Sequence, residues 1–400
     1  MNEIATVGVL GAGTMGAGIV QVAAEAGLDV VVHDPVAGAT ERARQRIEGF
    51  LARKVEKEQL SGEEATAAAA RIGQATSLEE LAGTDLVIEA IPEELELKRD
   101  AFRRLDAVAD TATVLATNTS SLSVARIASA TTQPGRVLGM HFFNPVPLMA
   151  LVEVVAGPLT EPQVTDAIAL LARRLGKTPV VAADTPGFIV NRVQRAYYLE
   201  AFRIYEEGLG GIAWIDDAMR GIGFRLGPFE LADVVGTDVN LAAGVAIFEG
   251  FFGDPRYRPA LVQRRVADAG RLGRKVGAGY YDYDGSDGAR GAAWSALDRG
   301  RLAHELDAAQ IEARILAAMV NEAASAVADG VATADAIDTA MRLGTNWPDG
   351  PLAWGERIGL SSVVNTLDAL HVVVPDGRYR VVPSLRALAD AGGSFFAGRD

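Results

Sequence analysis

The sequence contains no cysteine among its 400 residues, and its basic residues are in the minority. Without cysteine it can form neither a disulfide bond nor a thiolate metal site, a composition that fits a reducing compartment. There are 38 lysines and arginines and 52 aspartates and glutamates, which gives a formal charge of −14. Nucleic acid is therefore disfavoured as a partner, since it normally requires a concentrated basic face. A small anionic ligand stays possible, because a few local amides and cations can hold a phosphate.

Long apolar runs and a targeting segment are also missing. No apolar run reaches the roughly 18 residues of a membrane span. The N-terminus, MNEIATVGVLGAG, carries Glu3 where a signal peptide has positive charge. No cluster of metal-ligating residues is visible. We therefore expect a cytoplasmic protein with no membrane partner and no metal, and the length predicts two or three domains.

Short β-branched runs alternate with longer helical stretches over the first 185 residues. The runs span residues 4–10, 29–34, 85–91, 113–118, 136–142, 151–156 and 178–184. This alternation predicts a mostly parallel sheet with helices on both faces. Residues 39–75 are rich in alanine, arginine and glutamate and are interrupted near 61–64. We expect them to form a helical hairpin inserted into or beside the sheet.

A glycine motif follows the first predicted strand. Gly11, Gly13 and Gly16 have G-x-G-x-x-G spacing at the start of a helix. These glycines allow a tight turn, close approach of the backbone to a pyrophosphate, and close helix packing. Asp34 ends the second predicted strand, where its carboxylate can accept hydrogen bonds from a ribose and repel a 2′-phosphate. Residues 1–184 are therefore predicted to form a Rossmann-type domain that binds NAD rather than NADP.

One histidine differs from the other three in its setting. His141 stands at the carboxyl end of a predicted strand, the edge where open α/β sheets bind ligands, and NPVP then turns the chain into LVEVV. Glu153 lies among valines in that next strand, so its carboxylate needs a partner. A carboxylate beside an imidazole fixes the tautomer that a general base requires. From this stretch alone, a catalytic pair and a purely structural pair are equally favoured.

Further polar groups are predicted near the same edge. Asn118 ends the strand predicted at 113–118 and Ser120 and Ser121 follow it, and capping of the next helix explains one of the hydroxyls. The others could serve a nicotinamide or a substrate carbonyl. Asn191 begins the first helix after the sheet, near the junction of the domains, where a cleft is expected.

The C-terminal half has long helical periodicity and contains an internal repeat. The residues that recur at a constant offset of 122 are Arg192, Glu200, Ala201, Gly208, Asp216, Ala218, Met219 and Arg220, which match Arg314, Glu322, Ala323, Gly330, Asp338, Ala340, Met341 and Arg342. One residue further, Gly227-Pro228 recurs as Gly350-Pro351. Ordered identity of this kind favours duplication. We therefore predict an all-helical first module at 185–284, a linker at 285–300 and an all-helical second module at 301–400.

The repeat also provides an internal control. Asn191 aligns with Ala313. The repeated fold therefore does not need asparagine at this position, which favours a functional role for Asn191.

Over residues 4–284 the sequence resembles the L-3-hydroxyacyl-CoA dehydrogenase family. The resemblance is carried by the motifs GAGTMGAGI, EAIPE, TNTSSLS, HFFNPVPLMALVEVV, DTPGFIVNR, GPFELAD and GRLGRKVGAGYYDY. It implies NAD-dependent oxidation of (S)-3-hydroxyacyl-CoA to 3-ketoacyl-CoA, in fatty acid or aromatic acid degradation, with a short-chain or 3-hydroxyadipyl substrate. The residues after 300 resemble family members with two C-terminal modules.

The resemblance also implies roles for individual residues. His141 would be the base and Glu153 its orienting partner, while Ser120 and Asn191 would hold the substrate hydroxyl and thioester region. The cofactor-binding set would be Gly11, Gly13, Thr14, Met15, Gly16, Asp34, Glu93, Lys98, Asn118, Ser120, Asn144 and Lys275. For Glu93 and Lys98 alone, an exposed helix pair is the simpler interpretation.

The sequence departs from the family in the inserted helices. The serine and lysine that contact CoA in the family correspond here to Leu51 and Glu58, so Lys54 and Lys57 nearby are the candidates for substrate binding. A substrate with a terminal carboxylate would need a cation, and Arg192, Arg195 and Arg225 are candidates by location.

Alternatives remain open for both function and assembly. The alternative functions are an NAD-dependent dehydrogenase of a free hydroxy or sugar acid and a catalytically silent NAD-binding protein. In simpler members of the family the single helical module dimerises, so the two modules here are expected to pair within the chain. Further oligomerisation stays possible.

Overall fold

A computed structural model describes residues 3–284, 289–298 and 304–397. The chain divides into two compact units, residues 1–188 and 189–400. The predicted domain boundary after residue 184 lies four residues earlier. Residues 285–288 and 299–300 of the predicted linker, and the start of the predicted second module at 301–303, lie outside the described residues.

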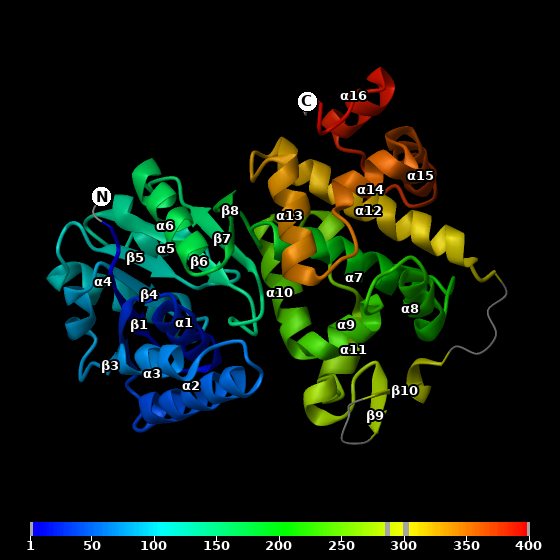
Figure 1. Cartoon of the computed structure of the whole chain (residues 1–400). Coiled ribbons are helices and arrows are strands. Elements are labelled where there is room, and N and C mark those ends of the chain that lie inside the picture. Colours follow the sequence, from blue (N-terminus) through cyan, green and yellow to red (C-terminus); the bar gives the residue numbers. More distant parts are fainter. Residues whose placement is uncertain (1–2, 285–288, 299–303, 398–400) are drawn as a thin grey trace. The chain divides into compact units, whose positions relative to one another are not determined.

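The first unit contains one eight-stranded sheet (Figure 1). Its strands are β1 Thr6–Leu10, β2 Asp29–His33, β3 Ile72–Gln74, β4 Leu86–Glu89, β5 Val114–Thr117, β6 Val137–Phe142, β7 Leu151–Ala156 and β8 Thr178–Ala183. The spatial order is β3-β2-β1-β4-β5-β6-β7-β8, and every neighbouring pair is parallel except β6 and β7. The strand order reverses between β1 and β4. In open sheets of this kind ligands bind at such a switch point, outside the carboxyl ends of the strands.

Helices cover both faces of this sheet, as expected. They are α1 Thr14–Glu25, α2 Ala39–Glu56, α3 Gly62–Ala70, α4 Leu95–Val108, α5 Val124–Ala128 and α6 Pro162–Arg174, with short 3-10 turns at Glu79–Gly83 and Pro134–Arg136. One apolar cluster joins α1, α2, α3 and α6 to the sheet, and a second joins α4 and α5 to the opposite face. Successive side chains of a strand point to opposite faces of the sheet. A strand that is buried on both faces is therefore a continuous run of apolar residues in the sequence.

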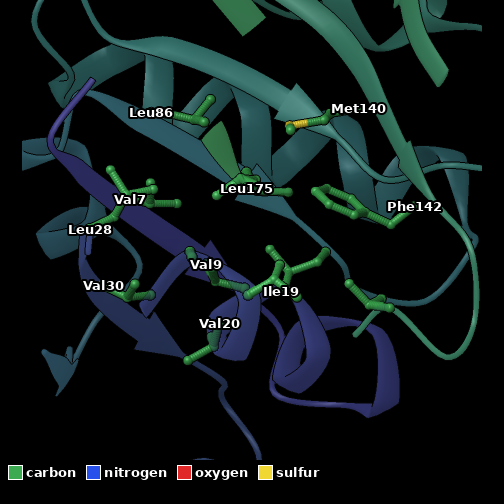
Figure 2. Packing of buried hydrophobic residues seen from close by; sticks show 14 of the residues in the cluster. Val7, Val9, Ile19, Val20, Leu28, Val30, Leu86, Met140, Phe142 and Leu175 are labelled. Atoms are coloured by element: carbon green, nitrogen blue, oxygen red, sulfur yellow. The ribbon is translucent and has the colours of Figure 1, made fainter. Parts of the chain in front are cut away.

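Figure 2 shows part of the first cluster, where side chains of β1, α1 and the neighbouring strands converge. Val9 points from β1 toward Ile19 of α1, while Val7 lies farther along β1, and Phe142 of β6 belongs to the same cluster. All four side chains are almost completely removed from water. Burying an aliphatic or aromatic side chain stabilises the fold by about 1.5–3 kcal/mol, so this layer fixes the strand ends that carry the polar residues.

The inserted segment is mostly as predicted but ends differently. The helices α2 and α3 form the expected hairpin around the break at residues 61–64, where Ser61 and Glu64 make a capping box. The prediction of helix through residue 75 is wrong, because Ile72–Gln74 pairs with β2 as the edge strand β3. Ile72 is buried against the sheet. Three residues are too few to show a strand period in the sequence.

The second unit is mainly helical (Figure 1). Its helices are α7 Val190–Glu206, α8 Ile212–Gly221, α9 Pro228–Val235, α10 Thr237–Gly250, α11 Leu261–Asp268, α12 Ala308–Ala328, α13 Ala334–Thr345, α14 Pro351–Ile358, α15 Leu360–Val373 and α16 Pro383–Ala391, with 3-10 turns at Pro255–Tyr257, Arg274–Val276 and Ser295–Leu297. Most residues of the helices α7 and α12 are buried.

The prediction of an all-helical region is wrong at one place. Strand β9, Tyr281–Asp284, pairs antiparallel with β10, Ala289–Ala293, inside the segment predicted as module end and linker. The hydroxyls of Tyr281 and Tyr283 donate to buried carboxylates of the helical unit. This anchoring of alternate tyrosines gives the ribbon a packed face, whereas its glycine-rich sequence predicts a loop.

In the described residues, no single helix is both long and apolar enough to cross a membrane. One pair, α9 and α10, passes that test jointly, with a bend of 100° between its members.

Candidate active site

The glycine turn between β1 and α1 has the geometry that its spacing predicts. Gly11 has φ 103°, and a Cβ at this position would lie 2.6 Å from the carbonyl oxygen of Ala90. A Cβ on Gly16 would lie 1.8 Å from the carbonyl oxygen of Gly11. Both glycines are therefore required by the protein's own packing. Gly13 is different, because a Cβ there would meet no atom of the described residues within 4 Å.

This open position fits a dinucleotide. Gly13 precedes α1, no side chain in the described part of the chain caps the helix, and the first turn carries no acidic residue. The unpaired N–H groups of a helix start attract an anion, and a side chain at position 13 would stand in its way. Thr14 and Met15 supply the first N–H groups of this turn. The glycine pattern and the bare helix start thus fit the pyrophosphate of a dinucleotide.

Asp34 lies directly after β2, beside this turn. Its two carboxylate oxygens accept hydrogen bonds from the backbone N–H groups of Ala12 (2.7 Å) and Val36 (2.8 Å). These bonds hold the carboxylate at the strand end, and each oxygen keeps acceptor capacity for a hydroxyl group. The geometry fits a ribose, with a negative charge that disfavours a 2′-phosphate.

The antiparallel pairing of β6 and β7 brings His141 and Glu153 together. They are direct partners in the register, and Nδ1 of His141 lies 2.7 Å from Oε2 of Glu153. His141 is 6% exposed and Glu153 is 0% exposed. A buried carboxylate at Nδ1 favours the tautomer with the proton on Nδ1 and the acceptor lone pair on Nε2. The pair predicted from the sequence therefore exists, in the arrangement that a general base requires.

Two aromatic rings surround the imidazole. The ring of Phe143 lies 4.5 Å from that of His141, and the ring of Phe188 lies 6.0 Å away. Phe188 is 1% exposed and has φ 49°, an unusual backbone conformation for a residue with a side chain. The sequence analysis missed both rings. The signal for Phe143 was its place beside His141, but Phe188 is 47 positions away in the chain and carried no signal.

Glu93 organises the loop after β5. One of its oxygens accepts hydrogen bonds from the Thr119 hydroxyl at 2.6 Å and from the backbone N–H groups of Ser120 at 2.9 Å and Ser121 at 3.1 Å. Although burial acts to raise it, the pKa of the Glu93 carboxyl is lowered, because the charge of Lys98 and these hydrogen bonds outweigh burial. Glu93 is therefore an anion that holds the loop containing Ser120.

Lys98 lies beneath this loop rather than on an exposed helix face. It is 1% exposed, and its ammonium lies 2.6 Å from Oε1 of Glu89 and 3.3 Å from Oε2 of Glu93. Burial raises the pKa of Glu89 in spite of that charge. The alternative of an exposed helix pair is therefore wrong for Lys98, which is buried, whereas Glu93 is exposed as that alternative expects. A place for both residues in the cofactor site stays a prediction.

Two predicted asparagines occupy the same edge of the first unit. Oδ1 of Asn118 accepts a hydrogen bond from the backbone N–H of Phe142 at 2.9 Å, which ties the end of β5 to the strand that carries His141. Asn144 is exposed in the following loop.

A cavity of about 490 Å³ lies between α1, α2 and the loop 144–148. Thr14 and Asn144, predicted for the cofactor, and Lys54 and Lys57, predicted for the substrate, all line it. Arg46 and Arg53, which the sequence analysis missed, add two cations to its wall. Lys54 also pairs with Glu25 at 2.6 Å. Leu51 is buried in the core and cannot replace the missing contact.

Asn191 and Lys275 belong to the second unit. Asn191 is the second residue of α7, and Lys275 lies in the turn Arg274–Val276. The ammonium of Lys275 lies 2.7 Å from both carboxylate oxygens of Asp238. The roles predicted for these two residues stay predictions.

Two family models match most of the chain. The model described as 3-hydroxyacyl-CoA dehydrogenase, NAD binding domain, matches residues 6–185. The model described as 3-hydroxyacyl-CoA dehydrogenase, C-terminal domain, matches residues 187–283 and again residues 311–394. The chain belongs to the 3-hydroxyacyl-CoA dehydrogenase family. NAD is therefore the cofactor for which the first unit is built.

Relatives within the 3-hydroxyacyl-CoA dehydrogenase family differ in length. The 3-hydroxyadipyl-CoA dehydrogenase of Escherichia coli is 37% identical, over 98% of this chain and 99% of its own. The 3-hydroxybutyryl-CoA dehydrogenase of Bradyrhizobium diazoefficiens is 43% identical, over 71% of this chain and 97% of its own.

Solved structures of the family show the same division. A 3-hydroxybutyryl-CoA dehydrogenase from Escherichia coli superposes with a TM-score of 0.88 at 37% identity, over 98% of this chain and 99% of that chain. The (S)-3-hydroxybutyryl-CoA dehydrogenase of Ralstonia eutropha superposes with a TM-score of 0.69 at 41% identity, over 71% of this chain and all of that chain.

Proposed function

We propose that the chain oxidises the hydroxyl group of a (S)-3-hydroxyacyl-CoA with NAD, and that the His141–Glu153 pair removes the hydroxyl proton. Membership of the family gives the reaction class. The single observation that carries the role of His141 is the 2.7 Å contact between its Nδ1 and the fully buried Glu153. Bound NAD supplies the hydride acceptor.

The residues of the chain then have separate tasks. Nε2 of His141 accepts the proton of the substrate hydroxyl, and the carboxylate of Glu153 stabilises the imidazolium that forms. Ser120 and Asn191 hold the hydroxyl and the thioester region. The apolar rings beside the imidazole exclude water from it. General base action contributes typically 10²–10⁴-fold, so orientation of the substrate supplies much of the remaining acceleration.

The phosphates of CoA have a candidate anchor in the first unit. The four cations Arg46, Arg53, Lys54 and Lys57 line one cavity on α2. Lys57 is exposed, whereas Lys54 is partly neutralised by Glu25. We therefore assign the larger share of phosphate binding to Lys57 and the two arginines.

The reaction is tested by following NADH formation from 3-hydroxybutyryl-CoA and from free 3-hydroxybutyrate. The proposal predicts rapid NADH formation from the thioester and little from the free acid. The opposite preference would favour a dehydrogenase of free hydroxy acids. Binding of NAD without turnover of either compound would identify a silent NAD-binding protein.

We further propose that the helical unit consists of two duplicated modules that pair within the chain. The helices α7 to α11 correspond one to one with α12 to α16 in the same order. The starts of α8 and α13 differ by 122 residues, as do those of α11 and α16. The starts of α9 and α14 differ by 123.

Reciprocal ion pairs between α7 and α12 support this pairing. Arg192 of α7 donates to Glu322 of α12 at 2.6 Å, and Arg314 of α12 donates to Glu200 of α7. Each arginine and each glutamate is separated from its counterpart by the repeat offset. All four side chains are buried, so each charge needs the oppositely charged partner that the other helix supplies.

A second layer has the same reciprocity. The hydroxyl of Tyr257 donates to Glu322 at 2.6 Å, and the hydroxyl of Tyr379 donates to Glu200 at 2.8 Å. Tyr257 and Tyr379 again differ by 122. Such a crossed pattern is expected where two copies of one surface meet around a two-fold axis.

If the modules pair in this way, the surface that dimerises in shorter relatives is already occupied. Sedimentation of the purified chain then gives no dimer that is held together through α7. A homodimer formed through the module of Asn191 would contradict the pairing.

A further inference from the structure

Arg195 is a buried cation that the proposed chemistry does not use. It lies on α7, one turn after Asn191, and is 3% exposed. Its Nη1 donates to the backbone carbonyl of Asn240 at 3.0 Å, and its Nε donates to that of Asn191 at 3.3 Å. In the described part of the chain no carboxylate forms an ion pair with it, and burial lowers its pKa. A buried arginine without an anion is rare, because the charge loses its hydration.

Two buried hydrogen-bond donors stand next to this guanidinium. The ring of Tyr198 lies 4.8 Å from the guanidinium carbon of Arg195. Among the described residues, no partner at hydrogen-bonding geometry is found for the buried Tyr198 hydroxyl or for the buried Nδ2 atom of Asn240. Burial raises the pKa of the Tyr198 hydroxyl, while the charge of Arg195 and an interaction with the side chain of Asn240 act in the opposite direction. The phenol therefore stays neutral and supplies no counter-charge.

The free donor of Asn240 is fixed by its neighbours. The backbone N–H of Ala260 donates to Oε1 of Gln263 at 2.9 Å, so Nε2 of Gln263 is the group that donates to Oδ1 of Asn240 at 2.8 Å. The NH₂ group of Asn240 is then turned to the other side. Buried donors beside a cation that has no anionic partner are unfavourable unless an acceptor joins them.

The second module shows that the fold does not need these polar groups. The counterparts of Arg195, Tyr198 and Asn240 are Ala317, Val320 and Val363, at offsets of 122, 122 and 123. All three are buried and apolar. At equivalent positions, the second module thus has three buried apolar side chains, whereas the first module has three hydrogen-bond donors.

We propose that Arg195, Tyr198 and Asn240 bind the carboxylate at the far end of a dicarboxylic 3-hydroxyacyl thioester. This inference rests on the proposed function. Four residues of α7 span about 6 Å, so Asn191 and Arg195 are separated by the length of a few methylene groups. A guanidinium with two further donors satisfies a carboxylate well.

The other two arginines named from the sequence do not compete for this role. Arg192 donates to Glu322 and Asp329, and Arg225 is exposed. Arg195 is therefore the specificity-determining residue.

The test compares two thioesters with six acyl carbons, 3-hydroxyadipyl-CoA and 3-hydroxyhexanoyl-CoA. In the unchanged chain we expect kcat/KM to favour the dicarboxylic substrate by at least about 10-fold. Arg195→Met should lower kcat/KM for the dicarboxylic substrate by about 10- to 100-fold and leave or raise the value for the uncharged one. Arg264→Met removes an exposed arginine of α11 and serves as the matched control with both values unchanged.

A second variant keeps the buried charge. Asn240→Asp retains an acceptor for Gln263 and places a carboxylate beside Arg195, so it should occupy the anion site and reduce the preference in the same direction. Equal kcat/KM for both thioesters in the unchanged chain would overturn the inference and leave the proposed function intact. Loss of activity toward both thioesters to the same degree in Asn240→Asp would also overturn it. Absence of NADH formation from either thioester by the unchanged chain would contradict the proposed function, and this inference with it.

Discussion

The proposed duplication gives the two halves of the helical unit the same order of helices, but the two halves differ in their polar residues. Arg192 and Glu200 have counterparts in Arg314 and Glu322, and these residues make the crossed ion pairs between α7 and α12. Asn191, one position before Arg192, has Ala313 as its counterpart. The residues that are identical in both halves thus hold α7 and α12 together. A polar residue that occurs in one half but not in the other is more consistent with a functional role than with a role in folding.

The shared positions also include the turn between the second and third helices of each half. Asp216 accepts the backbone N–H groups of Phe229 and Glu230, and Asp338 accepts those of Leu352 and Ala353. In both halves the aspartate caps the start of a helix that begins with Gly-Pro.

The glycines of these turns show the same constraint. A Cβ on Gly227 would lie 2.3 Å from Asp216, and a Cβ on Gly350 would lie 2.1 Å from Asp338. Neither half could accept a larger residue at this place.

The largest effect on stability is expected when a buried ion pair between α7 and α12 is removed. Glu200→Gln and Glu322→Gln each leave a buried arginine without its anion, which should lower the free energy of unfolding by about 3–5 kcal/mol. Because the two sites are reciprocal, the two losses should be similar. Urea unfolding of both variants measures this.

An exposed pair provides the control for these variants. Glu48→Gln removes the partner of Arg44 on α2, where both side chains are about half exposed, and should change stability by less than about 1 kcal/mol. A lowered free energy of unfolding in only one of Glu200→Gln and Glu322→Gln would show that the two halves are not equivalent.

Exchanging Asn191 and its counterpart Ala313 should change activity without changing stability. Asn191→Ala copies the second half into the first and should lower kcat/KM by about 10- to 100-fold, through loss of a substrate hydrogen bond, with unfolding unchanged. Ala313→Asn, the reverse exchange, should affect neither quantity. Steady-state kinetics with thermal unfolding on the same samples distinguishes the two. Equal activity of Asn191→Ala and the unchanged chain would remove Asn191 from the site.

The last effect is a dependence of stability on pH. Burial raises the pKa of Asp216 to about 7 and that of Asp338 to about 6, from 3.8. A raised pKa means that the folded state binds the proton more tightly. The stabilising contribution of each aspartate is therefore complete below pH 4 and is lost as pH rises toward 7 or 6, by at most about 1.4 kcal/mol per pH unit.

This pH dependence can be measured by urea unfolding between pH 4 and pH 8. The stability of the unchanged chain relative to Asp216→Asn should fall up to about pH 7, and relative to Asp338→Asn only up to about pH 6. A relative stability that rises with pH in this range would reverse the sign assigned to both groups.

Much of the first unit could be predicted because its signals are local. The glycine motif lies within six residues, and the strands of a sheet buried on both faces are continuous apolar runs. His141 and Glu153 are 12 positions apart on two adjacent strands, so their contact follows once the turn between the strands is recognised. The short edge strand β3 was missed because three residues carry no period.

Contacts between distant segments could not be predicted. The repeat located Arg192 and Glu322, but nothing in the sequence indicated that each arginine pairs with the glutamate of the other copy. The burial of Lys98 could not be predicted because it depends on Glu89, which ends a different strand. The ribbon of β9 and β10 depends on tyrosines that reach buried carboxylates 50 and 65 positions away.

The most direct measurement is the turnover of His141→Gln together with its affinity for NAD. If the imidazole held by Glu153 removes the hydroxyl proton, kcat should fall by about 10²–10⁴-fold while NAD binds as in the unchanged chain. Glu153→Gln should reduce kcat in the same direction, because the tautomer and the imidazolium lose their support. A kcat close to that of the unchanged chain in His141→Gln would contradict the account.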